Sequence, residues 1–238
     1  MRLFSDCGID ATLVLEFTEE LRALTATKFV KQYLIDGLGL QELVFGFDSK
    51  FGHDRGGNPE SLGPLSQELG FAITEIEPLR INGRAVSSTA VREAVQLGDL
   101  VATEKMLGRP ASILGTVVAG DKRGRQLGFP TANLRLHHEL SPPRGVYACM
   151  IKINGGDALL AGAVNLGIRP SFDNVEPSIE VHLIDFDSDL YGKTLEVFFL
   201  EKLREERKFD GVDDLRYQIT LDVSAAKLVC AQFISSKS

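Results

Sequence analysis

Apolar runs of strand length alternate with longer helical stretches over the first hundred residues. Residues 11–15 and 43–46 are short apolar runs, and residues 71–77 alternate apolar with charged side chains, as a half-buried strand does. Residues 19–35 carry apolar side chains at helical spacing, and a second predicted helix ends near Gly70. This order of strands and helices predicts a parallel sheet with helices packed against it.

Two more predicted helices follow, and their ends carry clear signals. Residues 88–97 have helical spacing, and a further helix begins after Asp99, a favourable N-cap residue. Gly108 can end that helix because glycine readily adopts the left-handed conformation of a helix C-terminus. We place the domain boundary at the Gly-Arg-Pro segment that begins there, with one domain in 1–108 and the other in 109–238.

Beyond the boundary the apolar pattern changes to strict alternation, which is the period of a strand. Glycine, proline and asparagine separate the alternating segments, as they do at tight turns. Several short strands of this kind predict a small antiparallel β-barrel. The alternating apolar positions are Tyr147, Cys149, Ile151 and Ile153, then Ile179, Val181 and Leu183, then Leu195, Val197 and Phe199.

The chain closes with one long predicted helix. Its apolar side chains recur at steps of three and four, which suits one face of the helix to packing on a core. The alternative is a helix that binds a partner through the same face. The apolar stripe consists of Val212, Leu215, Ile219, Val223, Ala226, Cys230 and Phe233.

Composition and charge narrow the class of protein. The 238 residues are 44% hydrophobic and 25% charged, which is typical of a soluble globular protein. A net charge of -7 argues against a general nucleic-acid binder. Three widely spaced cysteines fit neither a disulfide framework nor a zinc site, and no apolar run approaches a membrane span. These features predict a cytoplasmic protein without a membrane role, and they leave its oligomeric state open.

Residues 115–133 combine a strand-like start with a loop rich in glycine and cations. Gly120 and Gly124 let the backbone approach a ligand without a β-carbon in the way. Lys122 and Arg125 supply positive charge in a protein that is acidic overall, which favours a small anion such as phosphate. The loop is not the common P-loop, because no Gly-Lys-Ser/Thr follows the glycines. The alternative interpretation is a flexible hairpin loop with solvated charges.

The loop ends in the sequence Pro-Thr-Ala-Asn. Thr131 and Asn133 lie two apart and share a face if the backbone is extended. Both offer neutral oxygen, which suits Mg²⁺ that already carries nucleotide phosphates and waters. Pro130 fixes φ just before them and so stiffens the backbone. The pattern therefore indicates a site for phosphate and a metal ion.

A carboxylate is held on the predicted strand 179–183. The alternation places three aliphatic side chains on one face and Glu180 with His182 on the other. Glu180 is either a solvent-facing strand residue or a base placed to accept a hydroxyl proton. His182 either orients Glu180 or fills space. The alternate aspartates in 185–189 lack the glycine and the distal glutamate of an EF-hand loop, so we interpret them as solvated turn acids.

Five segments of the second domain match, in order, the riboflavin kinase module. The segments are Gly128 to Asn133, Gly162 to Phe172, Ile179 to Leu183, Leu190 to Lys193, and Leu203-Arg204 with Lys208-Phe209-Asp210. Together they cover nearly all of residues 110–233. The domain therefore resembles that module, and the resemblance implies a Greek-key barrel with a C-terminal helix that phosphorylates riboflavin with ATP and Mg²⁺.

The resemblance also implies roles for individual residues. Glu180 stands at the position of the glutamate that accepts the proton of the terminal ribityl hydroxyl, while Thr131 and Asn133 contact Mg²⁺ and the phosphates of ATP. The nucleotide loop comprises Gly120, Lys122, Gly124 and Arg125, and the flavin contacts are Asn165, Arg169, Tyr191 and Arg204. From the residues alone, Tyr191 can equally be a packing aromatic and Arg204 part of a surface ion pair.

The first domain resembles the other half of the bacterial bifunctional riboflavin kinase and FAD synthetase, a Rossmann-like nucleotidyltransferase. The matching segments are residues 45–52 and 86–92. In that family the domain opens with a strand and a His-x-Gly-His loop, and no histidines of this chain have that spacing. We therefore expect an incomplete domain with an open sheet edge. Four residues that match the adenylyltransferase signature are interpreted as a retained helix cap in a disabled site: Ser87, Ser88, Thr89 and Arg92.

Three functions are compatible with these patterns. The first is an ATP- and Mg²⁺-dependent kinase that converts riboflavin to FMN. The second applies to a fragment of a longer bifunctional protein and adds adenylyl transfer to FMN, giving FAD. The third is a non-catalytic flavin-binding module, because small barrels also serve as binding domains. We expect the first, with riboflavin, FMN, ATP and ADP as the ligands.

Overall fold

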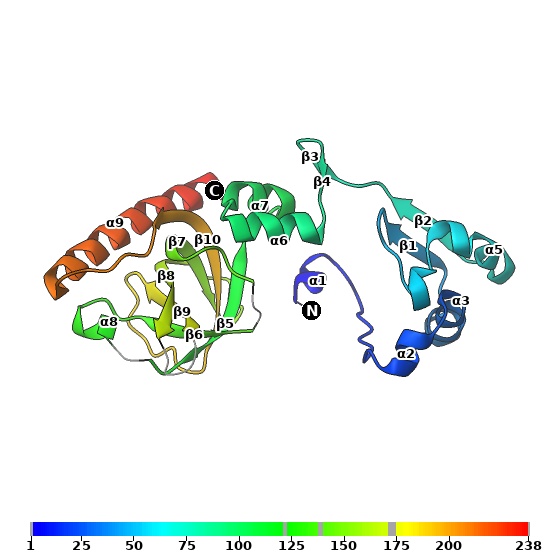
Figure 1. Cartoon of the computed structure of the whole chain (residues 1–238), viewed down its shortest axis with the longest axis horizontal. Helices are drawn as coiled ribbons and strands as arrows, with labels where there is room; N and C mark the ends of the chain where they lie inside the picture. The colour runs from blue at the N-terminus through cyan, green and yellow to red at the C-terminus, as the bar shows by residue number, and fades with distance from the viewer. Residues whose placement is uncertain (1, 121–122, 138–139, 171–174, 238) are drawn as a thin grey trace. The chain divides into compact units, whose positions relative to one another are not determined.

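The computed structural model describes residues 2–120, 123–137, 140–170 and 175–237. The chain divides into two compact units, Met1–Leu79 and Arg80–Ser238. We call them the first unit and the second unit. Figure 1 marks the helices and strands of both along the chain, and each unit has its own hydrophobic core.

A two-stranded parallel sheet forms the centre of the first unit. β1 (Glu42–Gly46) pairs with β2 (Ala72–Ile76) over their whole lengths. The crossover between them contains α5 (Pro59–Leu69), because parallel strands need a long connection. This arrangement confirms the predicted strand, helix, strand order. The unit also contains α1 (Arg2–Asp6), α2 (Glu19–Ala23), α3 (Ala26–Phe29), a π-helix (Val30–Ile35), α4 (Asp36–Leu38) and a 3₁₀ turn (His53–Arg55).

The predicted strand at residues 11–15 is wrong. The segment forms no strand, and Leu13 and Val14 are 52% and 73% exposed. An apolar run becomes a strand only where a neighbouring strand completes its hydrogen bonds. The predicted helix at residues 19–35 is also interrupted, because Thr25 starts a new helix by accepting a hydrogen bond from Lys28 N at 3.4 Å.

Helix α5 ends at Gly70 as predicted, and local signals at both ends fix its bounds. The side chain of Asn58 accepts a hydrogen bond from Ser61 N at 3.0 Å, and Ser61 Oγ accepts one from Asn58 N at 3.1 Å. Pro59 occupies the first helical position, and Gly70 ends the helix with φ 74°. The helix packs against a small core that contains Ala26, Val30, Phe45, Leu62, Leu65 and Phe71.

Two short helices near the start of the second unit have the predicted bounds. They are α6 (Ser88–Leu97) and α7 (Leu100–Leu107). Asp99 caps α7 through its side chain, and a glycine ends each helix in the left-handed conformation. Local end signals are therefore sufficient to place these two helices.

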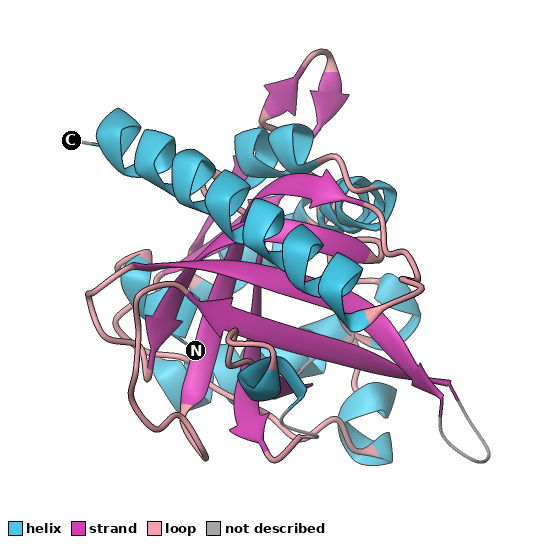
Figure 2. Cartoon of the chain, turned by 90° about the vertical axis from the view of Figure 1, so that its left-hand side faces the viewer, coloured by secondary structure: helices cyan, strands magenta, loops and turns pink. Residues whose placement is uncertain are grey.

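Six antiparallel strands close into a barrel (Figure 2). The order around it is β5, β6, β9, β8, β7 and β10, and β10 pairs with β5 to complete the wall. β7, β8 and β9 are consecutive neighbours and β10 returns beside β7, which is a Greek key and confirms the predicted fold. The strands of the unit are the hairpin β3 (Arg80–Ile81) and β4 (Arg84–Ala85), and the barrel strands β5 (Ser112–Val118), β6 (Ala132–Leu136), β7 (Gly145–Ile153), β8 (Leu160–Pro170), β9 (Val175–Leu183) and β10 (Thr194–Arg204).

The alternating apolar side chains point into the barrel as predicted, with Ile153 at the edge of the core. Tyr147 is fully buried, and its ring meets Phe199 edge to face at 5.3 Å between centroids. Its hydroxyl donates to Pro143 O at 2.5 Å. Burial, with a smaller effect of the Glu205 charge, raises the pKa of Tyr147 to about 12. The folded barrel therefore holds this phenol in its neutral form.

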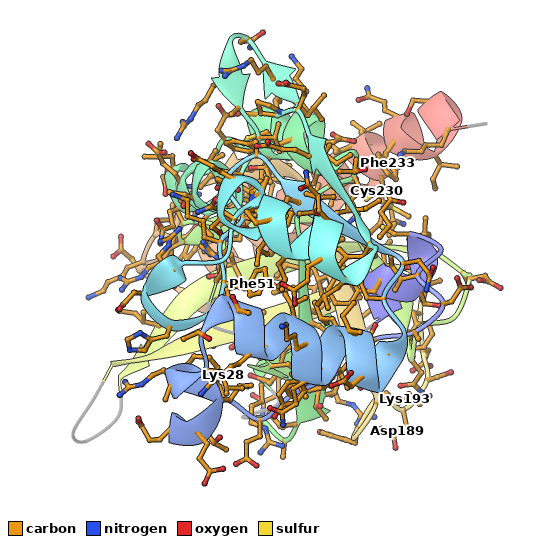
Figure 3. The ribbon with its side chains drawn as sticks, turned by 90° about the vertical axis from the view of Figure 1, so that its right-hand side faces the viewer. Lys28, Phe51, Asp189, Lys193, Cys230 and Phe233 are labelled. Carbon is orange, nitrogen blue, oxygen red and sulfur yellow. The ribbon has the colours of Figure 1, made fainter. Side chains whose placement is uncertain are left out.

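The long helix α9 (Val212–Lys237) packs on the outside of the barrel against β7, β8 and β10. Ala226 and Cys230 are buried, whereas Val212 at the start of the predicted stripe is 65% exposed. Cys230 and Phe233 mark the C-terminal half of the helix in Figure 3. By length and composition alone, α9 is the one helix in the described residues that could cross a membrane, which is weak evidence for a span.

Candidate functional site

Three polar residues form a row across adjacent strands on the outer wall of the barrel. Asn133 on β6 stands opposite Glu180 on β9, and Glu180 stands opposite Asn165 on β8. The neighbouring Val164 and Val181 are buried in the barrel core, so the row faces outward. Directly opposite residues on antiparallel strands have β-carbons about 5 Å apart. The sheet register therefore brings together residues that are far apart in the sequence.

This row lines a cavity of about 460 Å³ that is closed on one side by residues of α9, and we call it the α9 cavity. Thr131 lines the same cavity, so the predicted phosphate residues and the predicted base converge. Much of the remaining lining is apolar or aromatic: Leu127, Phe129, Phe209, Leu215, Ile219 and Val223. A few polar groups on an apolar wall are typical of a site for an organic ligand.

A second cavity of about 490 Å³ shares Thr131 and Asn133 with the first. The loop after β5 contributes Gly120 and Arg125 to it, and the loop before β10 contributes Tyr191. We call it the loop cavity. Thr131 and Asn133 therefore stand where the two cavities meet.

Two glycines allow the loop after β5 to approach these residues closely. A β-carbon at Gly120 would collide with the side-chain amide of Asn133, and one at Gly124 would collide with the carbonyl oxygen of Phe129. Larger residues would push these groups aside, so the approach requires glycine. The loop also contains a short helix, α8 (Arg123–Gln126), which the sequence analysis missed because four residues show no helical period. The predicted contact Lys122 lies outside the described residues.

Arg204 is held by a carboxylate on α9. Its Nε donates to the two oxygens of Asp222 at 2.9 and 3.0 Å, and its Nη2 donates to Oδ2 at 2.8 Å. The side chains of Arg204 and Asp222 are 20% and 7% exposed, and both line the α9 cavity. Gln218 donates a further hydrogen bond to Asp222 at 2.8 Å. Of the open interpretations of Arg204, the ion pair is present, but it is partly buried and ties β10 to α9.

The sequence analysis missed Asp222. The residue follows Ile219 by three and precedes Ala226 by four, so it continues the buried face of α9. The available signal was a charged residue at a position on the apolar face of the helix, because a buried carboxylate needs a partner. The partner itself could not be predicted, since Arg204 lies on a different element.

Tyr191 does not join the other flavin candidates that the structure describes. It is 52% exposed and lines the loop cavity, whereas Asn165 and Arg204 line the α9 cavity. The side chain of Arg169 lies outside the described residues, although its backbone belongs to β8. The predicted flavin group is therefore divided between the two cavities.

The residues that match the adenylyltransferase signature lie at the start of α6. Ser87 is the N-cap, and its Oγ accepts a hydrogen bond from Ala90 N at 3.2 Å. Ser88 and Thr89 form the first helical turn, and Arg92 is exposed one turn later. Ser87 therefore caps α6, and the disabled site expected around these four residues stays a prediction.

No group of three or more His, Cys, Asp or Glu side chains is placed to hold a metal ion within the described residues. The junction of the two cavities instead offers the neutral side-chain oxygens of Thr131 and Asn133. Such a donor set suits a divalent ion that brings phosphate and water ligands with it. The residues present therefore fit Mg²⁺ bound together with a nucleotide.

Two family models match separate parts of the chain. The riboflavin kinase model matches residues 107–230, and the FAD synthetase model matches residues 1–90. Because the second match begins at residue 1, the expected loss of the front of that domain is not confirmed. The predicted boundary at residue 108 lies near the start of the kinase match, whereas the compact units divide after Leu79, so the boundary stays a prediction.

Curated relatives named bifunctional riboflavin kinase/FMN adenylyltransferase resemble nearly the whole chain. The Haemophilus influenzae relative is 39% identical over 92% of this chain and 71% of its own length. The Escherichia coli K12 relative is 38% identical over 95% and 72%, and the Bacillus subtilis relative is 37% identical over 92% and 69%. The crystal structure of a protein named macrolide-efflux protein, from Streptococcus pneumoniae, matches with a TM-score of 0.82 and 32% identity, over 95% of this chain and 72% of that chain.

Proposed function

Because the chain belongs to the bifunctional riboflavin kinase/FMN adenylyltransferase family, we propose that it phosphorylates riboflavin with ATP, giving FMN and ADP. The kinase match spans the six strands of the barrel and most of α9, which supports this function for that part of the chain. The observation that carries the proposed chemistry is the convergence of Thr131, Asn133 and Glu180 on the α9 cavity.

We assign riboflavin to the α9 cavity and the nucleotide to the loop cavity. The α9 cavity combines apolar walls with the polar side chains of Asn165 and Arg204, which suits a planar ring that carries a polar tail. The loop cavity presents Arg125, whose guanidinium can bind phosphate. The phosphoryl group then passes between the cavities beside Thr131 and Asn133. Under this assignment Tyr191 lies on the nucleotide side, and the flavin contact predicted for it is not supported by its position.

Glu180 is the base of the proposed reaction. Its carboxylate accepts the proton of the terminal ribityl hydroxyl as that oxygen forms a bond to the γ-phosphorus and the bond to the β-phosphate oxygen breaks. Thr131 and Asn133 hold the metal and orient the phosphates. Bound Mg²⁺ supplies positive charge that offsets the charge on the phosphate oxygens. Positioning and charge account for most of the rate in such transfers.

Incubation of the chain with riboflavin, ATP and Mg²⁺ tests the proposal, with the flavin products separated by chromatography. FMN supports the kinase, whereas the absence of any product would overturn it in favour of a non-catalytic flavin-binding module. Glu180→Gln should lower turnover by ~10² or more, a typical acid–base contribution, with nucleotide binding nearly unchanged. Glu201→Gln, at an exposed position of β10, is the matched control and should retain turnover. Wild-type turnover in Glu180→Gln would remove Glu180 from its role.

The FAD synthetase match favours a second candidate function, the adenylylation of FMN. Support for this activity is narrower than for the kinase, because no His-x-Gly-His sequence is present and Ser87 caps its own helix. The experiment supplies FMN and ATP and measures FAD and pyrophosphate. Formation of both products would show that the adenylyltransferase half is active.

We also propose that the protein acts in the cytoplasm without a membrane or nucleic-acid partner. Helix α9 buries Asp222 against Arg204 and packs on the barrel, which fits a core helix better than a lipid-facing span. Nothing in the described residues favours the macrolide efflux for which the Streptococcus protein is named. Fractionation of cells that express the full chain tests the location, and recovery in the membrane fraction would contradict it.

A further inference from the structure

The backbone ladder between β6 and β9 is short. Among the described residues, two pairs join these strands, Ala132 with Val181 and Asn133 with Glu180. The chain that precedes Ala132 leaves the sheet and enters the loop that contains α8. The ladder therefore ends directly beside Thr131, a residue of the proposed phosphate site.

A side chain of β9 continues the connection where the backbone pairing ends. Nδ1 of His182 lies 2.8 Å from Pro130 O. The imidazole ring also meets the ring of Phe129 edge to face, at 5.7 Å between centroids and an interplanar angle of 81°. Both partners belong to the loop, whereas His182 lies on a strand that is paired with β8 along its length. The imidazole therefore attaches the loop to the barrel wall.

The direction of the hydrogen bond follows from its acceptor. A carbonyl oxygen can only accept, so Nδ1 of His182 carries the proton in this contact. The carbonyl of Pro130 belongs to the peptide bond that leads into Thr131. That peptide unit is trans and planar, so a fixed carbonyl oxygen also sets the direction of the Thr131 N–H and of the chain that follows.

We propose that His182 is a positioning residue that sets the orientation of Thr131 for binding the metal–nucleotide complex. The proposal rests on the proposed kinase function, and it assigns His182 a role other than orienting Glu180 or filling space. His182 acts through the Pro130 peptide and not on the reacting atoms. Its loss should therefore weaken the use of MgATP and leave the affinity for riboflavin nearly unchanged.

Three substitutions separate the hydrogen bond from the ring packing. In asparagine the amide nitrogen is bonded to Cγ, as Nδ1 is in histidine, so His182→Asn keeps a donor near the Pro130 carbonyl. In His182→Gln the amide nitrogen is one bond further out, near the position of Nε2. His182→Phe keeps a ring against Phe129 and has no donor. His182→Gln and His182→Phe should raise KM for MgATP about 3- to 10-fold, the range that a lost hydrogen bond implies, with KM for riboflavin within about 2-fold of wild type.

Cleavage by trypsin after Arg125 gives a second readout that does not depend on turnover. The loop should be cleaved faster in His182→Gln and His182→Phe than in wild type, because its attachment to β9 is lost. His182→Asn should stay close to wild type in both KM for MgATP and cleavage. Thermal unfolding of each variant shows that the barrel remains folded.

Two results would overturn the inference. Wild-type KM and cleavage in His182→Phe would show that the donor is unnecessary, and equal defects in His182→Asn and His182→Gln would show that ring packing alone matters. These results can be distinguished from a failure of the proposed kinase function. If Glu180→Gln is inactive while His182→Gln is normal, the positioning role alone fails, and if the wild-type chain makes no FMN, the proposed function fails and the catalytic consequence fails with it.

Discussion

The two units complete their sheets in different ways. In the barrel every strand has two neighbours, so the wall has no free edge. In the described part of the first unit, β1 and β2 pair only with each other, and a two-stranded sheet is marginal in water. The row of Asn133, Glu180 and Asn165 lies on the closed wall, where β9 is held by β6 on one side and β8 on the other. Closure thus gives the candidate site a fixed geometry.

The two units also differ in how far they bury the apolar side chains of their strands. Leu195 and Val197 in the barrel have no exposed surface, whereas Val44 and Ile76 on the parallel strands are 57% and 53% exposed. Parallel strands normally bury both faces, so this exposure is unusual for them. The barrel therefore has a complete core within its own wall, while the first unit depends on a smaller core between its helices and one sheet.

Two leucine substitutions test whether the units are energetically separate. Leu195→Ala in the barrel should lower the free energy of unfolding of that unit by about 3 kcal/mol, because it leaves a cavity in a dense core. Leu62→Ala should destabilise the first unit by a similar amount and leave riboflavin phosphorylation intact. Urea unfolding followed by circular dichroism, together with the kinase assay, measures both effects. Equal loss of FMN formation in the two variants would show that the comparison is wrong.

Two ion pairs extend the comparison of burial. The pair between β10 and α9 is partly buried, whereas a pair in the described part of the first unit is exposed. Asp222→Asn should cost about 2 kcal/mol, less than a fully buried pair, since Arg204 is one-fifth exposed. Glu68→Gln breaks the pair with Lys31, in which both side chains are exposed, and should cost less than about 0.5 kcal/mol. Thermal melting measures the change in Tm of each variant. Similar shifts in Tm would contradict the difference in burial between the two ion pairs.

The asparagines Asn133 and Asn58 separate function from stability. Asn133→Ala should raise the Mg²⁺ concentration for half-maximal kinase activity by about 10-fold, as expected for one lost ligand contact. Asn58→Ala removes the N-cap of α5 and should cost about 1 kcal/mol in the first unit, without a change in the metal titration. An unchanged titration in Asn133→Ala would remove that residue from the metal site.

Alkaline pH should weaken the barrel through Tyr147. Its folded pKa is raised to about 12, so the unfolded chain releases the proton first, and the stabilising contribution is complete below pH 10 and is lost as the pH rises towards 12. At pH 11 the loss should be about 1 kcal/mol. Tyr147→Phe should show a smaller fall in Tm between pH 9 and 11 than wild type, although it also lacks the hydrogen bond to Pro143. An equal fall would exclude Tyr147 as the cause.

Elements with local end signals could be predicted from the sequence. Helices α6 and α7 have the expected bounds because their caps lie within a few residues of them. The barrel strands could be recognised by their alternation. The apolar run at residues 11–15 carries the same kind of signal, yet it forms no strand, because a strand also needs a neighbour that no local pattern supplies.

The features of the candidate site also fall into those that could be predicted from the sequence and those that could not. The chemistry of Thr131, Asn133 and Glu180 could be inferred from residue type, spacing and family resemblance. The short helix α8 could not, because four residues show no helical period. The division of Tyr191 from Arg204 and the partner of Asp222 could not either, because each depends on which distant segments meet.

The sequence by itself determined the period of each element, the positions of the caps and the kinds of groups available for phosphate transfer. Only the tertiary structure decided that Asn133 stands opposite Glu180, that Arg204 turns to Asp222, and that His182 reaches Pro130. The physical reason is that propensities and caps act over a few residues. Strand register and barrel closure instead depend on the packing of the whole unit.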